Sequence, residues 1–145
     1  MSLETTINHA SCEEIAIFLE DNAMAFNPPF NTSVDIESYA AKLVEYAVRF
    51  EMRDGDALVA LLSAYINSEN GVAYIPYICV KKGYEGCNLG QQLFGQFYQY
   101  CRLRGVERVE LEVRSNNHRA MLFYEKQGFV MRSSNDEKIQ LVKIL

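Results

Sequence analysis

The chain has 145 residues, of which 49% are hydrophobic and 23% are charged, proportions typical of a globular protein. Its net charge of −5 argues against non-specific nucleic-acid binding, which needs a basic surface, so we expect no nucleic-acid partner. We expect residues 1–145 to form a single domain with no membrane contact, because no apolar run approaches the ~20 residues of a spanning helix.

The cysteines and histidines do not form a metal-binding pattern. The four cysteines lie far apart, at Cys12, Cys79, Cys87 and Cys101. His9 and His118 have no cysteine or acidic partner at ligand spacing, so we expect no metal. The first residues lack a signal-peptide pattern. Four free thiols in a reducing cytoplasm are therefore the expected state.

The N-terminal third has mainly helical periodicity. Residues 11–14 form a capping box that opens a helix, and the two prolines within residues 27–31 end it. A second helix is predicted over residues 36–47. Upstream of these helices, residues 5–7 are the only candidate for a first strand.

From residue 48 onward the pattern becomes rich in strands. Residues 48–53 and 57–66 predict a hairpin, and residues 72–80 a third strand in which Pro76 indicates a bulge or an edge. The remaining elements are a helix over 89–104, a strand over 108–113, a helix over 117–127 and strands over 129–132 and 138–144. The pattern predicts an α/β (α+β) fold, with a mixed, mostly antiparallel central sheet flanked by helices.

The turn between the third strand and its helix, over residues 81–91, is rich in glycine. A helix N-terminus presents unpaired N–H groups and the positive end of its dipole, which suit a pyrophosphate. Glycine lets the backbone approach a ligand closely, and Asn88 is the next most tolerant of positive φ. On spacing alone, simple turn chemistry is the more frequent explanation. The segment is not a Walker loop, because no Gly-Lys-Ser/Thr follows.

A later segment carries a more specific pattern. Its residues fit the spacing Asn-x-x-Ala-x-x-x-Tyr-Glu-x-x-Gly-Phe, at Asn117, Ala120, Tyr124, Glu125, Gly128 and Phe129. Together with the turn, this segment resembles the GCN5-related N-acetyltransferase (GNAT) superfamily, and in particular the ribosomal-protein alanine acetyltransferases. The resemblance covers roughly residues 57–132. The turn matches less well, since Glu85 replaces the family's Arg or Gln and Asn88 replaces its Gly.

The resemblance implies acetyl-CoA as co-substrate and a pair of splayed central strands. Backbone groups of one strand would bind the pantetheine arm, and amides of the turn would bind the pyrophosphate. The implied contacts are Ile78, Cys79 and Val80 for the arm, and Glu85, Gly86, Cys87, Asn88, Leu89, Gly90 and Gln91 for the pyrophosphate. The Glu85 carboxylate would have to point away from the diphosphate to avoid like-charge repulsion. Asn117 would cap the next helix and reach the cofactor arm, although a plain N-cap explains it equally well.

The same resemblance indicates which side chains move protons. Tyr124 would protonate the CoA thiolate that leaves when an amine attacks the thioester; the alternative is that this ring only packs in the core. Glu112 lies 12 residues before Tyr124 and would deprotonate the amine through a water. Alternatively, Glu110 and Glu112 both lie on one solvated face of a strand. Tyr77 is a further candidate for proton transfer.

We therefore expect an N-acetyltransferase that moves an acetyl group from acetyl-CoA to a primary amine by direct attack in a ternary complex. The acceptor would be a small-molecule or peptide amine, contacted by residues 27–31 and 133–137, which carry no recognisable acceptor code. The alternative is a non-catalytic acyl-CoA-binding or interaction domain with a degenerate cofactor loop. The terminal strands could also pair across a homodimer.

Overall fold

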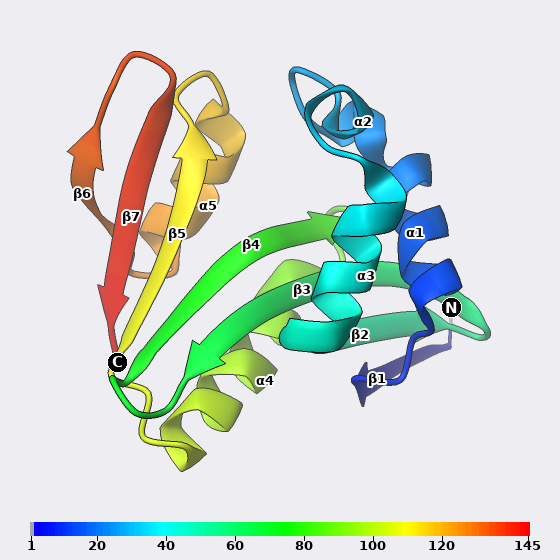
Figure 1. Ribbon diagram of the computed structural model, residues 1–145, viewed down its shortest axis with the longest axis horizontal. Helices are drawn as coiled ribbons and strands as arrows, with labels where there is room; N and C mark the ends of the chain where they lie inside the picture. The colour runs from blue at the N-terminus through cyan, green and yellow to red at the C-terminus, as the bar shows by residue number, and fades with distance from the viewer. Residues whose placement is uncertain (1) are drawn as a thin grey trace. The chain divides into compact units, whose positions relative to one another are not determined.

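The computed structural model describes residues 2–145, which group into two compact units (Figure 1). The N-terminal unit contains the chain up to Ala64 together with Tyr77–Phe97. The C-terminal unit contains Tyr65–Pro76 and Tyr98–Leu145. The chain crosses between the units within three regular elements rather than through a linker.

Seven strands are hydrogen-bonded in the order β1-β2-β3-β4-β5-β7-β6. Their bounds are Leu3–Ile7 (β1), Val48–Asp54 (β2), Ala57–Asn67 (β3), Val72–Val80 (β4), Arg108–Arg114 (β5), Val130–Ser134 (β6) and Lys138–Ile144 (β7). The β1–β2, β2–β3, β5–β7 and β6–β7 pairs are antiparallel, and β4–β5 is parallel. The predicted mixed, mostly antiparallel sheet with flanking helices is confirmed.

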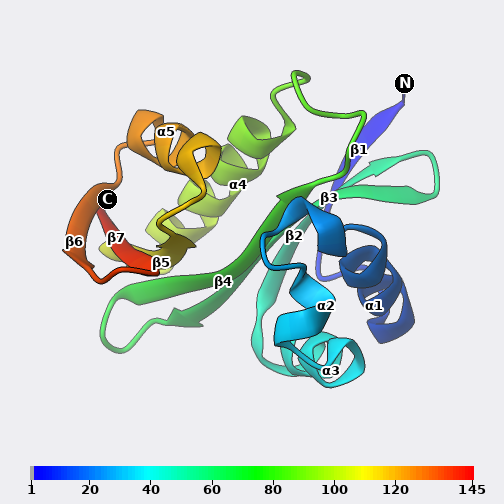
Figure 2. The same ribbon diagram turned by 90° about the horizontal axis from the view of Figure 1, so that it is seen from above.

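In the N-terminal unit, one face of β1–β3 is covered by helices that precede β2 (Figure 2). These are α1 (Cys12–Asp21), the 3₁₀ turn η1 (Ala23–Ala25), α2 (Phe30–Ser33) and α3 (Ile36–Tyr46). The first half of α4 (Leu89–Leu103) packs on the other face, where the rings of Phe97 and Phe50 meet at 5.6 Å. Alternation along β2 thus sends Phe50 toward α4 and Glu51 toward the other helices.

The predicted capping box of α1 forms only in part. The Ser11 hydroxyl accepts the Glu14 N–H at 3.1 Å, as expected. The Glu14 carboxylate does not return to the Ser11 backbone, because it binds both terminal nitrogens of Arg53 on β2. The helix also ends earlier than the prolines require, at Asp21, where the Asn22 side-chain amide donates to the Phe18 carbonyl at 2.8 Å.

The first strand is a regular element, although the sequence offered little sign of it. All five residues of β1 pair antiparallel with β2, from Leu3 opposite Asp54 to Ile7 opposite Phe50. None of the five is fully buried, because β1 is the outer strand of the sheet. An exposed edge strand needs no strong apolar alternation, and this explains the weak signal.

In the C-terminal unit, one face of β5 and β7 lies under α5 (His118–Lys126) and the last turns of α4. The Tyr98 hydroxyl of α4 donates to the Gln127 side chain at 3.1 Å, and the Lys143 ammonium of β7 lies 4.1 Å from the centre of the Tyr98 ring. Val109 and Leu111 of β5 are buried on this side. The intervening residues of β5 therefore project from the opposite, open face.

Candidate functional site

The carboxyl-terminal half of β4 carries three of the predicted cofactor contacts: Ile78, Cys79 and Val80. The parallel ladder between β4 and β5 runs from the Val72–Arg108 pair to the Ile75–Leu111 pair. It ends at the residue before Pro76, which has no N–H to donate. A strand that leaves its ladder in this way offers backbone groups that an extended ligand can pair with. This arrangement suits the pantetheine arm, but the contact itself stays a prediction.

The loop between β4 and α4 adopts the backbone that the sequence predicted. Gly83, Gly86 and Asn88 have φ values of +98°, +84° and +59°. Asn88 therefore takes the left-handed conformation at the position where the related family has glycine, and its carbonyl accepts the first helical hydrogen bond, from Gln92. The substitution keeps the shape of the turn. Helix α4 then begins at Leu89, with first-turn N–H groups that have no acceptor within the helix.

The side chain of Glu85 turns back onto its own loop. One carboxylate oxygen accepts the Gly83 N–H at 2.8 Å. The negative charge consequently stays beside the amides proposed to bind a pyrophosphate, although it is directed toward the start of the loop. At the corresponding position the related family has Arg or Gln, so this loop differs from the family mainly in charge rather than in backbone shape.

The segment that leads into α5 has the expected local geometry. The Asn117 side chain accepts the Ala120 N–H at 3.1 Å, so its N-cap role is confirmed. Gly128 ends the helix with φ of +96°, and the Phe129 N–H donates to the Tyr124 carbonyl at 3.0 Å. Between these ends Tyr124 is 8% exposed, and its ring meets that of Phe129 at 5.9 Å. The ring of Tyr124 is thus held in place by the core, which is compatible with a positioned proton donor.

The two glutamates of β5 lie on the open face of the C-terminal unit. Glu112 pairs with the Lys138 ammonium at 3.1 Å and accepts a hydrogen bond from Gln140. Glu110 pairs with Arg108 at 2.7 Å and with Arg132 at 3.0 Å. From the sequence, a shared solvated face for these two glutamates is the alternative to a role for Glu112 as a base. The structure confirms the shared face, and the role of Glu112 as a base stays a prediction.

The surroundings of Glu112 keep its carboxyl group ionised. Partial burial raises its pKa, but the hydrogen bonds from Gln140 and Lys138 and the charges of Lys138 and Arg114 lower it by more. The net pKa of Glu112 is below its ordinary value. The group is therefore ionised at neutral pH and can attract an ammonium group, while the lowered pKa makes it a weaker base.

Two further features of this open face were not identified from the sequence. A shallow depression of about 210 Å³ is lined by Glu110, Arg132, Ser133, Gln140 and Leu141. Tyr74 stands opposite Glu110 in the β4–β5 ladder, and its pKa is raised first by burial and then by the charges of Glu112 and Glu110. The sequence predicts the strand that contains Tyr74, but it does not predict the register with β5 that places Tyr74 opposite Glu110.

Tyr77 and Cys79, both on β4, have surroundings that do not favour proton transfer or nucleophilic attack. Tyr77 is 3% exposed and packs against the rings of Phe18, Phe26 and Phe30. Burial is the main cause that raises the pKa of its hydroxyl well above the ordinary value. Burial likewise raises the pKa of the Cys79 thiol to about 11. Both side chains belong to the core of the N-terminal unit.

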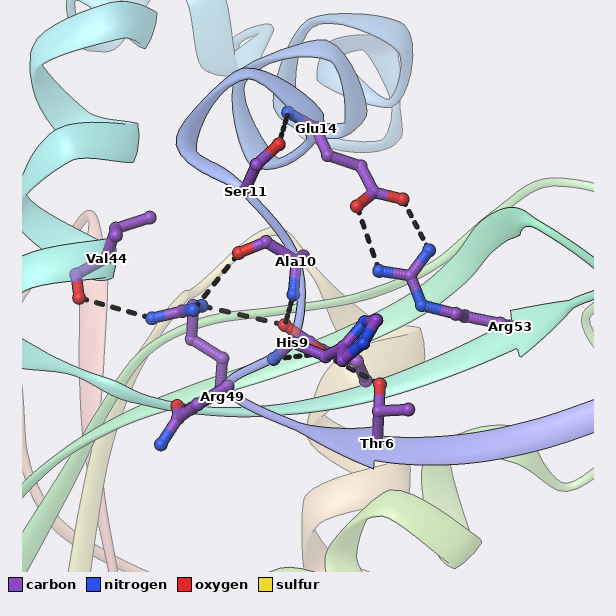
Figure 3. Close-up of polar contacts among 10 residues, drawn as sticks. Thr6, His9, Ala10, Ser11, Glu14, Val44, Arg49 and Arg53 are labelled. Atoms are coloured by element: carbon purple, nitrogen blue, oxygen red, sulfur yellow. Dashed lines mark hydrogen bonds and ion pairs between the residues drawn. The ribbon is translucent and has the colours of Figure 1, made fainter.

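A buried carboxylate in the N-terminal unit, Glu51, has several polar partners, among them His9, Ala10 and Arg49, which Figure 3 labels. This fully buried residue accepts hydrogen bonds from the Thr6 hydroxyl at 2.8 Å and from the N–H groups of His9 and Ala10 at 2.9 and 3.0 Å. It also pairs with Arg49 at 3.6 Å. These contacts fasten the segment between β1 and α1 to β2, so we assign Glu51 a structural role.

Two other kinds of feature, a metal-ligand cluster and a membrane-spanning helix, are absent from residues 2–145. No group of three or more His, Cys, Asp or Glu side chains in this part of the chain could hold a metal ion. No helix in the same range is long and apolar enough to cross a membrane.

Comparisons with known proteins agree with this geometry. The sequence model of the acetyltransferase (GNAT) family matches residues 15–129. A candidate [ribosomal protein bS18]-alanine N-acetyltransferase of Bacillus subtilis (strain 168) is 28% identical over 130 residues, which make up 88% of this chain and 82% of that protein.

Two solved structures resemble the whole chain. The ribosomal-protein-S18-alanine N-acetyltransferase of Escherichia coli is 22% identical, with a TM-score of 0.77 over 97% of this chain and 94% of its own. The PaiA N-acetyltransferase of Thermoplasma acidophilum, solved in complex with coenzyme A, is 16% identical, with a TM-score of 0.78 over the full length of both chains. At these identities the structural likeness supports the fold alone.

Proposed function

We propose a reaction for this chain from one premise: the chain belongs to the acetyltransferase (GNAT) family. It is accordingly an N-acetyltransferase that uses acetyl-CoA as its co-substrate. The match over residues 15–129 includes both the β4–α4 loop and α5. The acceptor and the residues that act in the reaction are the proposals developed below.

We propose that an amine attacks the acetyl thioester directly in a ternary complex. The amine nitrogen bonds to the acetyl carbonyl carbon, the C–S bond breaks, and the CoA sulfur leaves as a thiolate. Tyr124 gives that sulfur a proton, and Glu112 takes a proton from the amine through a water. The observation that carries this assignment is the geometry of α5, where the Asn117 cap and the Gly128 stop hold Tyr124 at its position in the motif.

For the co-substrate, we propose that backbone groups of residues 78–80 bind the pantetheine arm. The amides of residues 85–91 would bind the pyrophosphate, and Asn117 would reach the arm from the start of α5. The positive φ of Gly86 and Asn88 supports this assignment, because it lets consecutive N–H groups turn toward one anion.

For the acceptor, we propose the α-amine of a peptide or protein N-terminus rather than a small-molecule amine. The relatives from Bacillus subtilis and Escherichia coli are both named for an alanine of a ribosomal protein. The ionised carboxylate of Glu112 suits an ammonium group. The depression beside it offers Arg132, Ser133 and Gln140 as partners for main-chain carbonyls of the following residues.

We also propose that residues 1–145 act as one domain in the cytoplasm. Support for one domain comes from β3, β4 and α4, each of which has residues in both units. Support for a reducing compartment comes from the cysteines, all four of which are free. A homodimer formed through the terminal strands stays a prediction, favoured by the exposed side chains of Val130 and Met131 on the outer strand β6.

A panel of acceptors tests the proposed function. The panel comprises a short peptide with a free N-terminal alanine and one internal lysine, the same peptide with a blocked N-terminus, and a polyamine. Acetylation is followed by release of free CoA thiol and located by mass spectrometry. The proposal expects acetylation at the α-amine of the free peptide and little reaction with the other two. Equal or faster acetylation of the blocked peptide or the polyamine would overturn the peptide assignment.

A further inference from the structure

A single side chain connects the β4–α4 loop to the β2–β3 hairpin. The Tyr84 hydroxyl donates to a carboxylate oxygen of Asp54 at 2.7 Å, across 30 residues of sequence. Asp54 is the last residue of β2, and its other oxygen accepts the Ser2 N–H at 2.9 Å. One carboxylate oxygen of Asp54 is therefore held by Ser2 while the other accepts from Tyr84.

The backbone around Tyr84 is held as well. The Tyr84 N–H donates to the Lys81 carbonyl at 3.0 Å, and the Lys81 N–H donates to the Val59 carbonyl of β3 at 2.8 Å. Within the loop, Glu85 accepts the Gly83 N–H. The first half of the loop is thus anchored to β2 and β3. The second half, from Gly86 onward, contains the residues with positive φ that lead into α4.

Tyr84 lies between Gly83 and Gly86, in the part of the β4–α4 loop where glycine would otherwise leave the backbone most conformational freedom. Glycine-rich segments lose more conformational entropy on ordering than other segments do. A loop that is already held in its binding conformation pays less of that entropy when the ligand arrives. The hydrogen bond to a carboxylate is charge-assisted, and it lowers the pKa of Asp54 and raises that of Tyr84. The contact is therefore suited to holding the loop in the absence of cofactor.

We propose that Asp54 and Tyr84 are positioning residues that hold the β4–α4 loop in the conformation that binds the diphosphate of acetyl-CoA. The inference rests on the proposed function, which assigns the pyrophosphate to this loop. Asp54 acts only through Tyr84, and Tyr84 acts through the backbone that follows it. A purely structural contact would change stability without changing cofactor affinity, so the two roles can be separated.

The test uses Tyr84→Phe, Asp54→Ala and the double variant, with Tyr46→Phe as a control because Tyr46 is an exposed tyrosine of the same unit. Calorimetry gives the dissociation constant of CoA, and steady-state rates give kcat and both KM values. Each single variant should raise the dissociation constant and the KM for acetyl-CoA about fivefold, as expected for one net hydrogen bond. The double variant should match the single ones, because both remove the same bond. The value of kcat and the amine KM should not change.

A second acyl donor makes the result specific to the diphosphate. Acetyl-pantetheine lacks that group, so its KM should be the same for wild type and variants. Unchanged CoA affinity in the variants, or an equal rise in KM for acetyl-pantetheine, overturns the inference. These outcomes leave the proposed function intact. A separate variant, Asn88→Val, tests the assignment of the pyrophosphate to this loop, because it disturbs the backbone of the loop directly. If Asn88→Val also leaves the CoA affinity unchanged, that assignment is wrong.

Discussion

Two strand carboxylates, one in each unit, have opposite surroundings. Glu51 of β2 is fully buried and has three hydrogen-bond donors and an arginine around it. Glu112 of β5 lies on an open face, with Lys138 and Gln140 beside it. The first cannot exchange a proton with a substrate without breaking the contacts that fold its unit. The second is ionised and accessible. The difference separates a carboxylate that stabilises the fold from one that is available for chemistry.

Glu51→Gln should cause the largest loss of stability. The substitution removes the charge that Arg49 faces and puts an amide N–H₂ against backbone donors, and breaking a buried pair costs about 3 kcal/mol or more. Urea unfolding measures the free energy. The control is Glu45→Gln on the exposed side of α3, which should stay within about 0.5 kcal/mol of wild type. A stable Glu51→Gln protein that has lost its activity would contradict the structural assignment.

Glu112→Gln should have the opposite effect to Glu51→Gln: a large loss of activity with a small loss of stability. Loss of a general base lowers kcat/KM by about 100-fold or more, whereas loss of an exposed ion pair costs at most about 1 kcal/mol of stability. Thiol release measures the rate. The matched control is Glu110→Gln, which removes a carboxylate from the same face; because Glu110 lines the proposed acceptor depression, the amine KM should rise while kcat stays within about threefold of wild type. Equal losses of kcat in the two variants would mean that the negative charge of the open face as a whole affects the rate, and that neither glutamate is the base.

A smaller effect is expected in the pH dependence of the unfolding free energy, to which the Glu112 carboxylate contributes in a defined direction. The pKa of Glu112 in the folded chain lies below its ordinary value of 4.5. The stability that this group contributes is therefore fully present above pH 4.5 and is lost as the pH falls through the lower, folded-state pKa. Unfolding free energies of wild type and Glu112→Gln, measured from pH 2 to 7, should differ most near neutrality and converge in acid. A difference that grows as the pH falls would contradict the lowered pKa.

Features that depend on neighbouring residues could be predicted from the sequence. The Asn117 cap, the Gly128 stop and the positive φ of Asn88 each follow from local backbone preferences, and each is confirmed. The fold class was also predictable, because the strand and helix periodicities and the motif in α5 agreed with one another. Local backbone preferences predicted the shape of the β4–α4 loop, proposed to bind the cofactor, even where two of its residues depart from the family.

Features that depend on distant partners could not be predicted. Glu14 leaves its capping box because Arg53, 39 residues away, competes for its carboxylate. The Tyr84–Asp54 contact and the polar contacts of Glu51 likewise join separate strands and loops. The surroundings of Glu112 depend on the register between β5 and β7, which places Gln140 opposite it. No spacing within a single element contains this information.

The proposed protonation of the departing CoA thiolate by Tyr124 is tested most directly by Tyr124→Phe. The variant keeps the ring that packs against Phe129 and removes only the hydroxyl. We predict that kcat falls about 100-fold, with the CoA dissociation constant unchanged. A kcat equal to that of wild type, measured with saturating acetyl-CoA and amine, would contradict the account.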